Sequence, residues 1–398
     1  MPRFLPLRAS VEWLRRAAKD RHAALCAADP DAPLHQAQLD IAREYGFPSW
    51  RAMIAHVEEV REKLRAAFPA AYQDRPPQPL PIPPDDADLA ALLAAVRAGD
   101  VTVTTELLNR RPALAMSRGP EGQTPLHVAA ECNDARLAIV LLAYEADPEA
   151  TYGESGHTAL SWAAVCHAMD FARALIRLAV QPDLYAAAGV CDVEAVRGFF
   201  DDAGRLIPGS ARTGSSRFSA DGKRLPCPPE SEEEQLLDAL CMACRNGRVE
   251  AAEFLLSKLP KTEFRGFMGA TPLHWACFGG STTIVERLLA AGADPTIRDH
   301  DLKCTPRNFG ICAPANWGLH FLVRARLDAD PTLLNLMDGQ TSALHEAAAG
   351  GSLETVRLLL ERGANPMLRD GKGRIASDRA AEKAHPEIVA LLKAAEAG

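Results

Sequence analysis

The residues best suited to chemistry are two cysteines at the spacing of a metal-binding pair. Cys241 and Cys244 form a Cys-x-x-Cys sequence, the arrangement with which many structural zinc sites begin. A zinc site normally takes four ligands from two such pairs, but the sequence has no second pair, and only Cys227 and Cys277 stand as further candidates. Small buried thiols in place of alanine are the simpler interpretation. We therefore predict no metal site and no cofactor.

Two further polar patterns fall short of a catalytic motif. His345-Glu346 begins like a zinc-protease sequence, but Ala349 stands where the second histidine is required. Asp299-His300-Asp301 has the residue types to bind a metal or act as a base, although a solvated turn is the simpler interpretation. Phosphate loops, nucleophile elbows and dinucleotide fingerprints do not occur in the sequence.

The elements that carry these residues recur at a nearly constant spacing. A leucine, or a residue in its place, appears in similar surroundings with steps of 34, 34, 33 and 34 residues: Leu92, Leu126 and Leu160, then Leu240, Leu273 and Arg307. A fixed period of 20 to 50 residues is typical of stacked repeat architectures. We therefore predict a repeat array from residue 88 to residue 398.

The stretch from residue 269 to residue 299 reads GATPLHWACFGGSTTIVERLLAAGADPTIRD and resembles the ankyrin repeat. The resemblance implies two short antiparallel helices and a turn, a unit that must stack on copies of itself to bury its apolar stripe. It further implies an all-α solenoid of eight or nine repeats, with a polar cap at its end. His127, His274 and His345 occupy the place where the family uses histidine for structural hydrogen bonds.

Two stretches depart from the repeat pattern. Residues 201–234 are an insertion rich in Gly, Ser, Pro and charge, with a basic set made of Arg212, Arg217, Lys223 and Arg224. This insertion is either disordered or passively packed, or it is a clamp over the concave face of the array. In residues 304–323, Arg307 and Asn308 replace the usual Leu and His, and Pro314 is expected to interrupt the helix pair. We expect this repeat to form the weakest interface of the array.

The chain ahead of the array is built differently. Residues 1–68 show short apolar stripes that predict three or four helices, with Gly46 ending one helix and Ser49 capping the next. The string LDIAREYGFPSW resembles a small helical module found ahead of ankyrin repeats in bacterial proteins. Residues 69–87 hold seven prolines and predict an extended, semi-rigid linker.

Composition limits the classes of partner. The net charge of −8 argues against nucleic acid, because phosphate contacts need a basic face. The sequence has no apolar run long enough to span a bilayer and no secretory signal, so we expect a cytoplasmic protein that does not bind membranes. The ten cysteines of this long chain are expected to be reduced. The oligomeric state is not indicated.

The resemblance leaves the surface as the working part of the molecule. In ankyrin proteins the turn tips and first helices line a concave groove, and large apolar or Arg side chains there mark contact sites. We therefore predict a non-catalytic scaffold that binds a partner protein through Trp162, Arg245, Phe267, Met268, Trp275, Phe278 and Phe309. The alternatives are that the tryptophans fill gaps between repeats, or that the protein is an enzyme. Such an enzyme would use a pocket between the insertion and the groove, with polar groups such as His157, Arg217 or Asp299.

Overall fold

The computed structural model describes residues 10–72, 82–178, 180–207, 231–259, 265–338 and 340–397. Every regular element in these ranges is a helix, and the few isolated bridge residues include an antiparallel pair, Tyr152 and His157. The chain divides into two compact bodies: residues 1–186 with 197–201 form the N-terminal body, and residues 187–196 with 202–398 form the C-terminal body. The predicted all-α class is confirmed.

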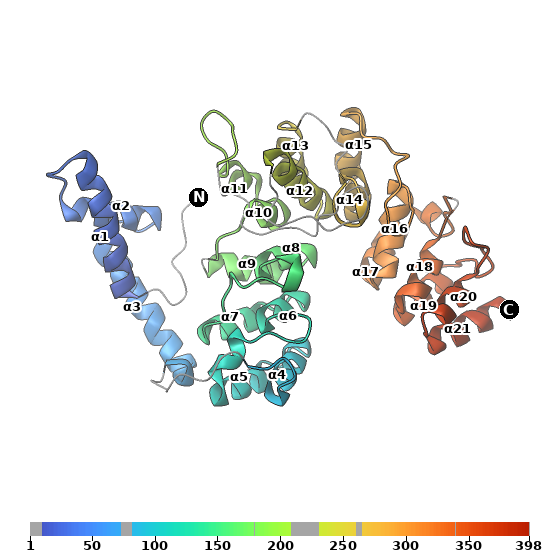
Figure 1. The fold of residues 1–398 in the computed structure, drawn as a ribbon, viewed down its shortest axis with the longest axis horizontal. Coiled ribbons are helices and arrows are strands. Elements are labelled where there is room, and N and C mark those ends of the chain that lie inside the picture. The colour runs from blue at the N-terminus through green and yellow to red at the C-terminus, as the bar shows by residue number, and fades with distance from the viewer. Residues whose placement is uncertain are drawn as a thin grey trace. The chain divides into compact units, whose positions relative to one another are not determined.

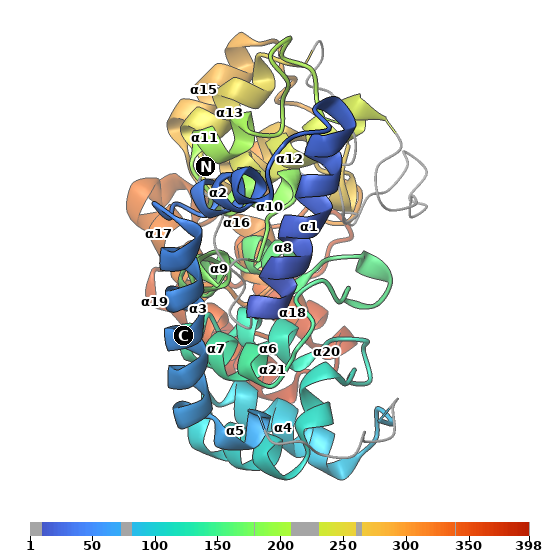
Figure 2. The same ribbon diagram turned by 90° about the vertical axis from the view of Figure 1, so that its left-hand side faces the viewer.

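Three helices precede the repeats in the N-terminal body: α1 (Val11–Ala28), α2 (Leu34–Glu44) and α3 (Trp50–Ala67). They pack on one another, with α2 running crosswise to α1 and α3 (Figure 1 and Figure 2), and bury Leu14, Ala18, Ile41, Ala42, Met53 and Val57 between them. The Ser49 hydroxyl accepts a hydrogen bond from the amide of Ala52 at the start of α3, as predicted. A short 3₁₀ turn, η1 (Pro69–Tyr72), follows, and residues 73–81 of the predicted linker lie outside the described residues.

Nine helix pairs follow in the ranges that the structure describes. Three belong to the N-terminal body: α4 (Ala87–Arg97) with α5 (Val101–Arg110), α6 (Pro125–Glu131) with α7 (Ala135–Ala143), and α8 (Ala159–Val165) with α9 (Met169–Arg177). The boundary between the bodies passes through α10 (Leu184–Val190) and α11 (Val193–Arg197). Five belong to the C-terminal body: α12 (Glu232–Arg245) with α13 (Val249–Leu256), α14 (Pro272–Gly279) with α15 (Thr282–Ala290), α16 (Pro306–Asn316) with α17 (His320–Ala329), α18 (Ala343–Gly350) with α19 (Leu353–Glu361), and α20 (Ala376–Glu382) with α21 (Pro386–Ala397).

Short 3₁₀ turns lie between several of the helices: η2 (Pro112–Met116), η3 (Gly153–Ser155), η4 (Phe267–Gly269) and η5 (Pro331–Leu333). Within each body, successive first helices pack on one another, and successive second helices form a parallel layer beside them (Figure 1). The predicted repeat architecture from about residue 87 is confirmed.

The Thr-Pro-Leu-His sequence starts the first helix of a repeat and ties it to the next repeat. His127 Nδ1 accepts a hydrogen bond from the Thr124 amide (3.3 Å), and its Nε2 donates to the His157 carbonyl on the next loop tip (3.0 Å). His274 repeats both contacts with Thr271 (3.1 Å) and Cys304 (3.2 Å). The scaffolding role predicted for these histidines is confirmed.

Small residues let the first helices approach closely. A Cβ atom added to Gly350 would lie 1.9 Å from the carbonyl oxygen of Asn316, and one added to Gly279 would lie 2.3 Å from that of Cys244. Neither separation is sterically possible, so both glycines are required by packing between neighbouring repeats.

The repeat that begins at Thr305 differs from the prediction. Its first helix, α16, has 11 residues and runs through Pro314, whereas α14 and α18 each have 8. Asn308 stands in the histidine place and donates to the Thr341 carbonyl (3.0 Å), which reproduces the histidine contact to the next tip. The expectation of an interrupted helix and a weak interface was therefore wrong, because Asn308 and the residues from Phe309 to Ala315 are buried.

Candidate partner-binding surface

Two loop tips of consecutive repeats lie against each other in the N-terminal body. One tip comprises residues 118–123 and the other residues 151–157. Arg118 Nη1 donates to the carbonyls of Gly122 (3.1 Å) and Thr151. Gly122 and Gly153 both have positive φ, and a Cβ atom on Gly122 would lie 2.9 Å from Gly153 Cα. The close approach of the two tips therefore depends on glycine, and it fixes the positions of the side chains around it.

Four side chains next to this contact combine aromatic rings with carboxylates, and we call them the Tyr152–Trp162 surface: Glu121, Glu131, Tyr152 and Trp162. The Tyr152 hydroxyl donates to Glu121 Oε2 (3.0 Å), and Trp162 Nε1 donates to Glu131 Oε1 (3.2 Å). The two ring centres lie 4.9 Å apart in an edge-to-face arrangement. Both rings are half-buried, and both carboxylate residues are exposed.

Each of the two rings, Tyr152 and Trp162, packs against a buried histidine. The ring of His127 lies 5.3 Å from Tyr152, and the ring of His157 lies 5.7 Å from Trp162. His157 is itself buried and also packs on Tyr185, at 5.4 Å. The aromatic part of the surface therefore rests on the core of the array.

Partial burial shifts the pKa of two of these groups, Glu131 and Tyr152. Desolvation raises the pKa of the Glu131 carboxyl, opposed by the hydrogen bond from Trp162 and the charge of Arg97. The pKa of Tyr152 is raised to about 12, first by desolvation and then by its hydrogen bond to Glu121. Tyr152 therefore remains a protonated donor at neutral pH.

The corresponding positions of the C-terminal body form a closed aromatic cluster. The guanidinium carbon of Arg245 lies 4.9 Å from the ring centre of Trp275, 4.3 Å from that of Phe278 and 5.2 Å from that of Trp317. Trp275 also packs edge-on against Phe309, at 5.3 Å. Trp317 follows the last turn of the long helix α16, so the additional length of this helix places an indole over its neighbours.

Most of the predicted contact residues that the structure describes are buried. Among the predicted contact residues whose side chains the structure describes, only Trp162 is half-exposed, as a contact residue on an open surface should be. Arg245, Met268, Trp275, Phe278 and Phe309 are 6%, 7%, 4%, 0% and 0% exposed. The alternative that the tryptophans fill gaps between repeats describes Trp275 well, because rings of its own and the following repeat pack on it. Partner binding through these five residues is a prediction that their burial does not favour.

The remaining predicted residues lie outside the described part of the chain. This applies to the side chain of Phe267 and to Arg212, Arg217, Lys223 and Arg224 of the insertion. The enzymatic alternative depends on a pocket beside this insertion. Two of the polar groups named for it, His157 and Asp299, are buried.

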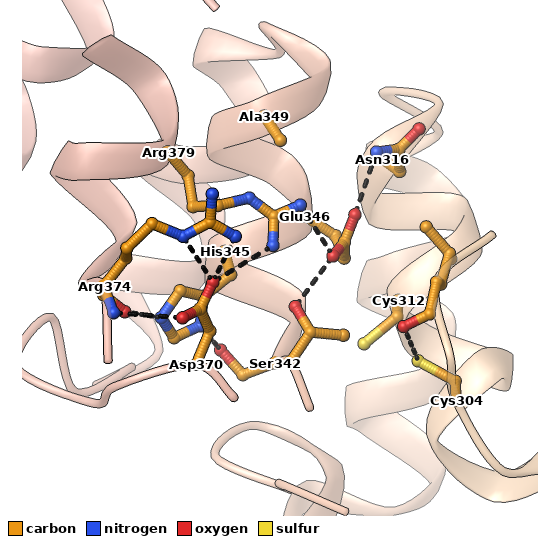
Figure 3. A network of polar contacts seen from close by, with 12 residues as sticks. Cys304, Cys312, Asn316, Ser342, His345, Glu346, Ala349, Asp370, Arg374 and Arg379 are labelled. Carbon is orange, nitrogen blue, oxygen red and sulfur yellow. Dashed lines mark hydrogen bonds and ion pairs between the residues drawn. The ribbon is translucent and has the colours of Figure 1, made fainter. Parts of the chain in front are cut away.

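A polar network joins three successive repeats of the C-terminal body (Figure 3). Glu346, which is 1% exposed, accepts hydrogen bonds from Thr341 (2.7 Å), Asn316 (3.0 Å) and Arg379 (3.0 Å). Arg379 also approaches Asp370, at 3.5 Å. Glu346 therefore holds together the repeats that contain α16, α18 and α20.

Arg374 anchors the second carboxylate of the network, Asp370, through a contact of 2.7 Å. Burial would raise the pKa of Asp370, but hydrogen bonds from the Arg374 side chain and from backbone amides hold that pKa well below its usual range. Each charge in this network has a partner of opposite sign, which is the condition for burying such groups.

The cysteines and the aspartate that could have bound a metal or acted in catalysis are buried and have structural roles. Burial raises the pKa of Cys241 and Cys244, so both thiols stay protonated, and neither forms a disulfide. We expected Asp299 to lie in a solvated turn, but it is only 1% exposed. Its carboxylate accepts hydrogen bonds from the backbone amides of Asp301, Leu302 and Cys304. No group of three potential metal ligands occurs among the residues that the structure describes. The described helices also include none with the length and apolar content to cross a bilayer.

Sequence reasoning missed Tyr152 and Trp317. Tyr152 lies on a loop tip directly before the glycine that contacts the preceding tip, a place that the repeat pattern could have indicated. Trp317 lies beyond the usual length of a first helix, so it has no counterpart in the other repeats.

A family model described as "Ankyrin repeats (3 copies)" matches residues 87–186, 223–299 and 311–398, more than half of the chain. The Ankyrin repeat and KH domain-containing protein mask-1 of Caenorhabditis elegans is 31% identical over 154 residues, 39% of this chain and 6% of that protein. The mitochondrial disaggregase of Bos taurus is 32% identical over 171 residues, 42% of this chain and 24% of that protein. The chain therefore matches less than a quarter of the length of either relative.

Proposed function

The chain belongs to the ankyrin repeat family, and we propose that it is a non-catalytic scaffold that recognises a partner protein with the first helices and loop tips of its repeats. Ankyrin repeats generally bind proteins, and their fold alone does not identify the partner. The contact site has to be argued from individual side chains.

The observation that carries the proposal is the Tyr152–Trp162 surface. It joins two half-buried aromatic rings to two exposed carboxylates, and hydrogen bonds hold each ring to one carboxylate. Aromatic side chains with a polar end are common among residues that dominate interface energies. Their fixed positions reduce the loss of conformational entropy on binding.

Further properties belong to the same proposal. Residues 1–68 would be the helical module that precedes ankyrin repeats in bacterial proteins, residues 69–87 a linker, and the protein cytoplasmic. The basic residues of the 201–234 insertion would contribute by closing over an acidic part of the partner.

Affinity capture with the full chain tests this function. Wild-type protein and the Trp162→Leu variant would be used as baits in lysate of the source cell, with Glu106→Gln on α5 as a control. We expect at least one protein to be enriched by the wild type and the control but not by Trp162→Leu, with all three baits fully folded at the temperature of the capture, as thermal unfolding would show. The same set of captured proteins for all baits would contradict a contact site at Trp162. A fourth bait, which lacks residues 203–232, would show whether the insertion contributes.

A further inference from the structure

The C-terminal body contains an internal example of how one of these tryptophans can hold a cation. Trp275 follows directly after the histidine place of its repeat, which His274 fills, and Arg245 lies four residues beyond the histidine place of the preceding repeat, which Cys241 fills. The guanidinium carbon of Arg245 is 4.9 Å from the centre of the Trp275 ring. A guanidinium over an indole at this distance is a favourable cation–π contact.

The N-terminal body has a tryptophan and a charged residue at the same two repeat positions, but the charge is negative. Trp162 occupies the position of Trp275, and Glu131 occupies the position of Arg245. Glu131 bonds to the edge of the indole through Nε1 (3.2 Å), and the indole remains half-exposed. Trp275 therefore contacts an arginine, whereas Trp162, at the same place in the N-terminal body, contacts a carboxylate.

We propose that the Tyr152–Trp162 surface binds an arginine side chain of the partner protein, with its guanidinium over the Trp162 indole and its N–H groups directed to Glu131 and Glu121. This inference rests on the proposed function and specifies the chemistry of the partner. The partner segment takes the place relative to Trp162 that Arg245 takes relative to Trp275.

The chemistry of the surface favours arginine over other side chains. Its planar guanidinium can stack on an aromatic face while it donates to carboxylates in its own plane. An ionised carboxylate can accept about four hydrogen bonds. Glu121 and Glu131 each accept one side-chain bond, from Tyr152 and Trp162, so further acceptor positions remain. A segment bearing a carboxylate would instead be repelled by both residues.

Two arginines of the N-terminal body lie near the Tyr152–Trp162 surface and offset part of its negative charge. Arg118 is exposed, and its guanidinium is bound to the carbonyls of the two tips. Arg97 is exposed at the end of α4, and its charge acts on both Glu131 and Tyr152. Arg97 would compete with an arriving arginine, so its removal should strengthen binding.

The test uses the full chain and two labelled peptides, hexa-arginine and hexacitrulline, which have nearly the same shape and differ in charge. Binding is measured by fluorescence anisotropy. We expect hexacitrulline to bind at least about tenfold more weakly than hexa-arginine, and Glu121→Gln/Glu131→Gln to weaken hexa-arginine binding about tenfold. Trp162→Leu should weaken it similarly, and Arg97→Gln should strengthen it about twofold.

The control variant Glu62→Gln/Glu106→Gln changes the net charge equally but lies on α3 and α5. It should bind hexa-arginine within about twofold of the wild type, since general attraction alone is affected. Equal weakening by the two double variants, or equal binding of the two peptides, would overturn the proposal. If the captured partner depends on Trp162 while hexa-arginine binding does not depend on Glu121 and Glu131, the inferred chemistry fails and the scaffold function stands.

Discussion

The carboxylate of Glu346 lies 3.0 Å from the guanidinium of Arg379, which belongs to the following repeat. The side chain of Glu346 is 2% exposed and that of Arg379 is 17% exposed, so this ion pair is largely removed from water. The equivalent position is occupied by Trp275 and Phe309 in the two preceding repeats. The array therefore joins its repeats through aromatic packing in one region and through paired charges in the next.

Substitution of Glu346 by Ala should destabilise the C-terminal body strongly. The change leaves Arg379, Asn316 and Thr341 without the carboxylate that they share. Removing one member of a buried pair costs about 3–5 kcal/mol. Urea unfolding would measure this loss, with the exposed Glu361→Ala on α19 as a control within about 0.5 kcal/mol of the wild type. Equal stability of both variants would show that the network contributes little.

The buried histidines predict a loss of stability in mild acid. Desolvation lowers the pKa of His127 to about 4 in the folded protein, against 6.5 for the free group. Between these values the unfolded chain binds more protons, so the free energy of unfolding falls as the pH falls from 6.5 to 4 and is constant with respect to this group above 6.5.

The variant His127→Gln removes this titration and isolates its contribution. From pH 7.5 to pH 5.0 the wild type should lose about 2 kcal/mol more than His127→Gln. His274, whose pKa is also lowered to about 4 by desolvation, predicts the same for His274→Gln. Urea unfolding at both pH values provides the measurement, and identical pH dependence of wild type and variants would refute the assignment.

Alanine at position 350 should destabilise the protein although it replaces a helical glycine. Gly→Ala in a helix interior normally stabilises by about 0.5–1 kcal/mol. Here the new methyl group would lie 1.9 Å from the Asn316 carbonyl oxygen, so α16 and α18 would have to separate. We expect a loss of about 1–3 kcal/mol. At Gly292, where a Cβ atom meets open space but φ is +90°, alanine should cost about 1 kcal/mol through backbone strain alone.

The two tryptophans of equivalent register should respond differently to substitution. Trp275→Ala removes a core side chain that is 4% exposed and should cost about 3–5 kcal/mol of stability. Trp162→Leu affects a half-exposed ring and should cost only about 1 kcal/mol. Thermal unfolding of both variants beside capture of the partner distinguishes the roles. A stable Trp275→Ala protein that no longer binds its partner would restore Trp275 as a contact residue.

The sequence predicted the repeats well because their signals are local. In the repeats that begin with Thr-Pro-Leu-His, the threonine and the histidine three residues later form a capping box within four residues, as Thr124 and His127 do. The ends of the N-terminal helices at Gly46 and Ser49 could be predicted for the same reason.

The burial of the candidate site could not be predicted, because it depends on contacts between repeats. The register places Trp162 and Trp275 on the same face, but the exposure of each ring depends on what the next repeat supplies. For Trp275 this is Phe309 and the additional length of α16 with Trp317, and neither follows from the repeat pattern. Asn308 was misread for a related reason, since its side chain makes the histidine contact with different atoms.

The additional turn of α16 has a consequence for any fragment of this chain. Trp317 covers Arg245, Trp275 and Phe278, so a product cut before residue 317 would keep these side chains and lose their cover. The rings would then form an exposed apolar patch, so the truncated product should self-associate and lose solubility. Useful cut points for shorter versions of the protein therefore lie after the complete α16–α17 pair.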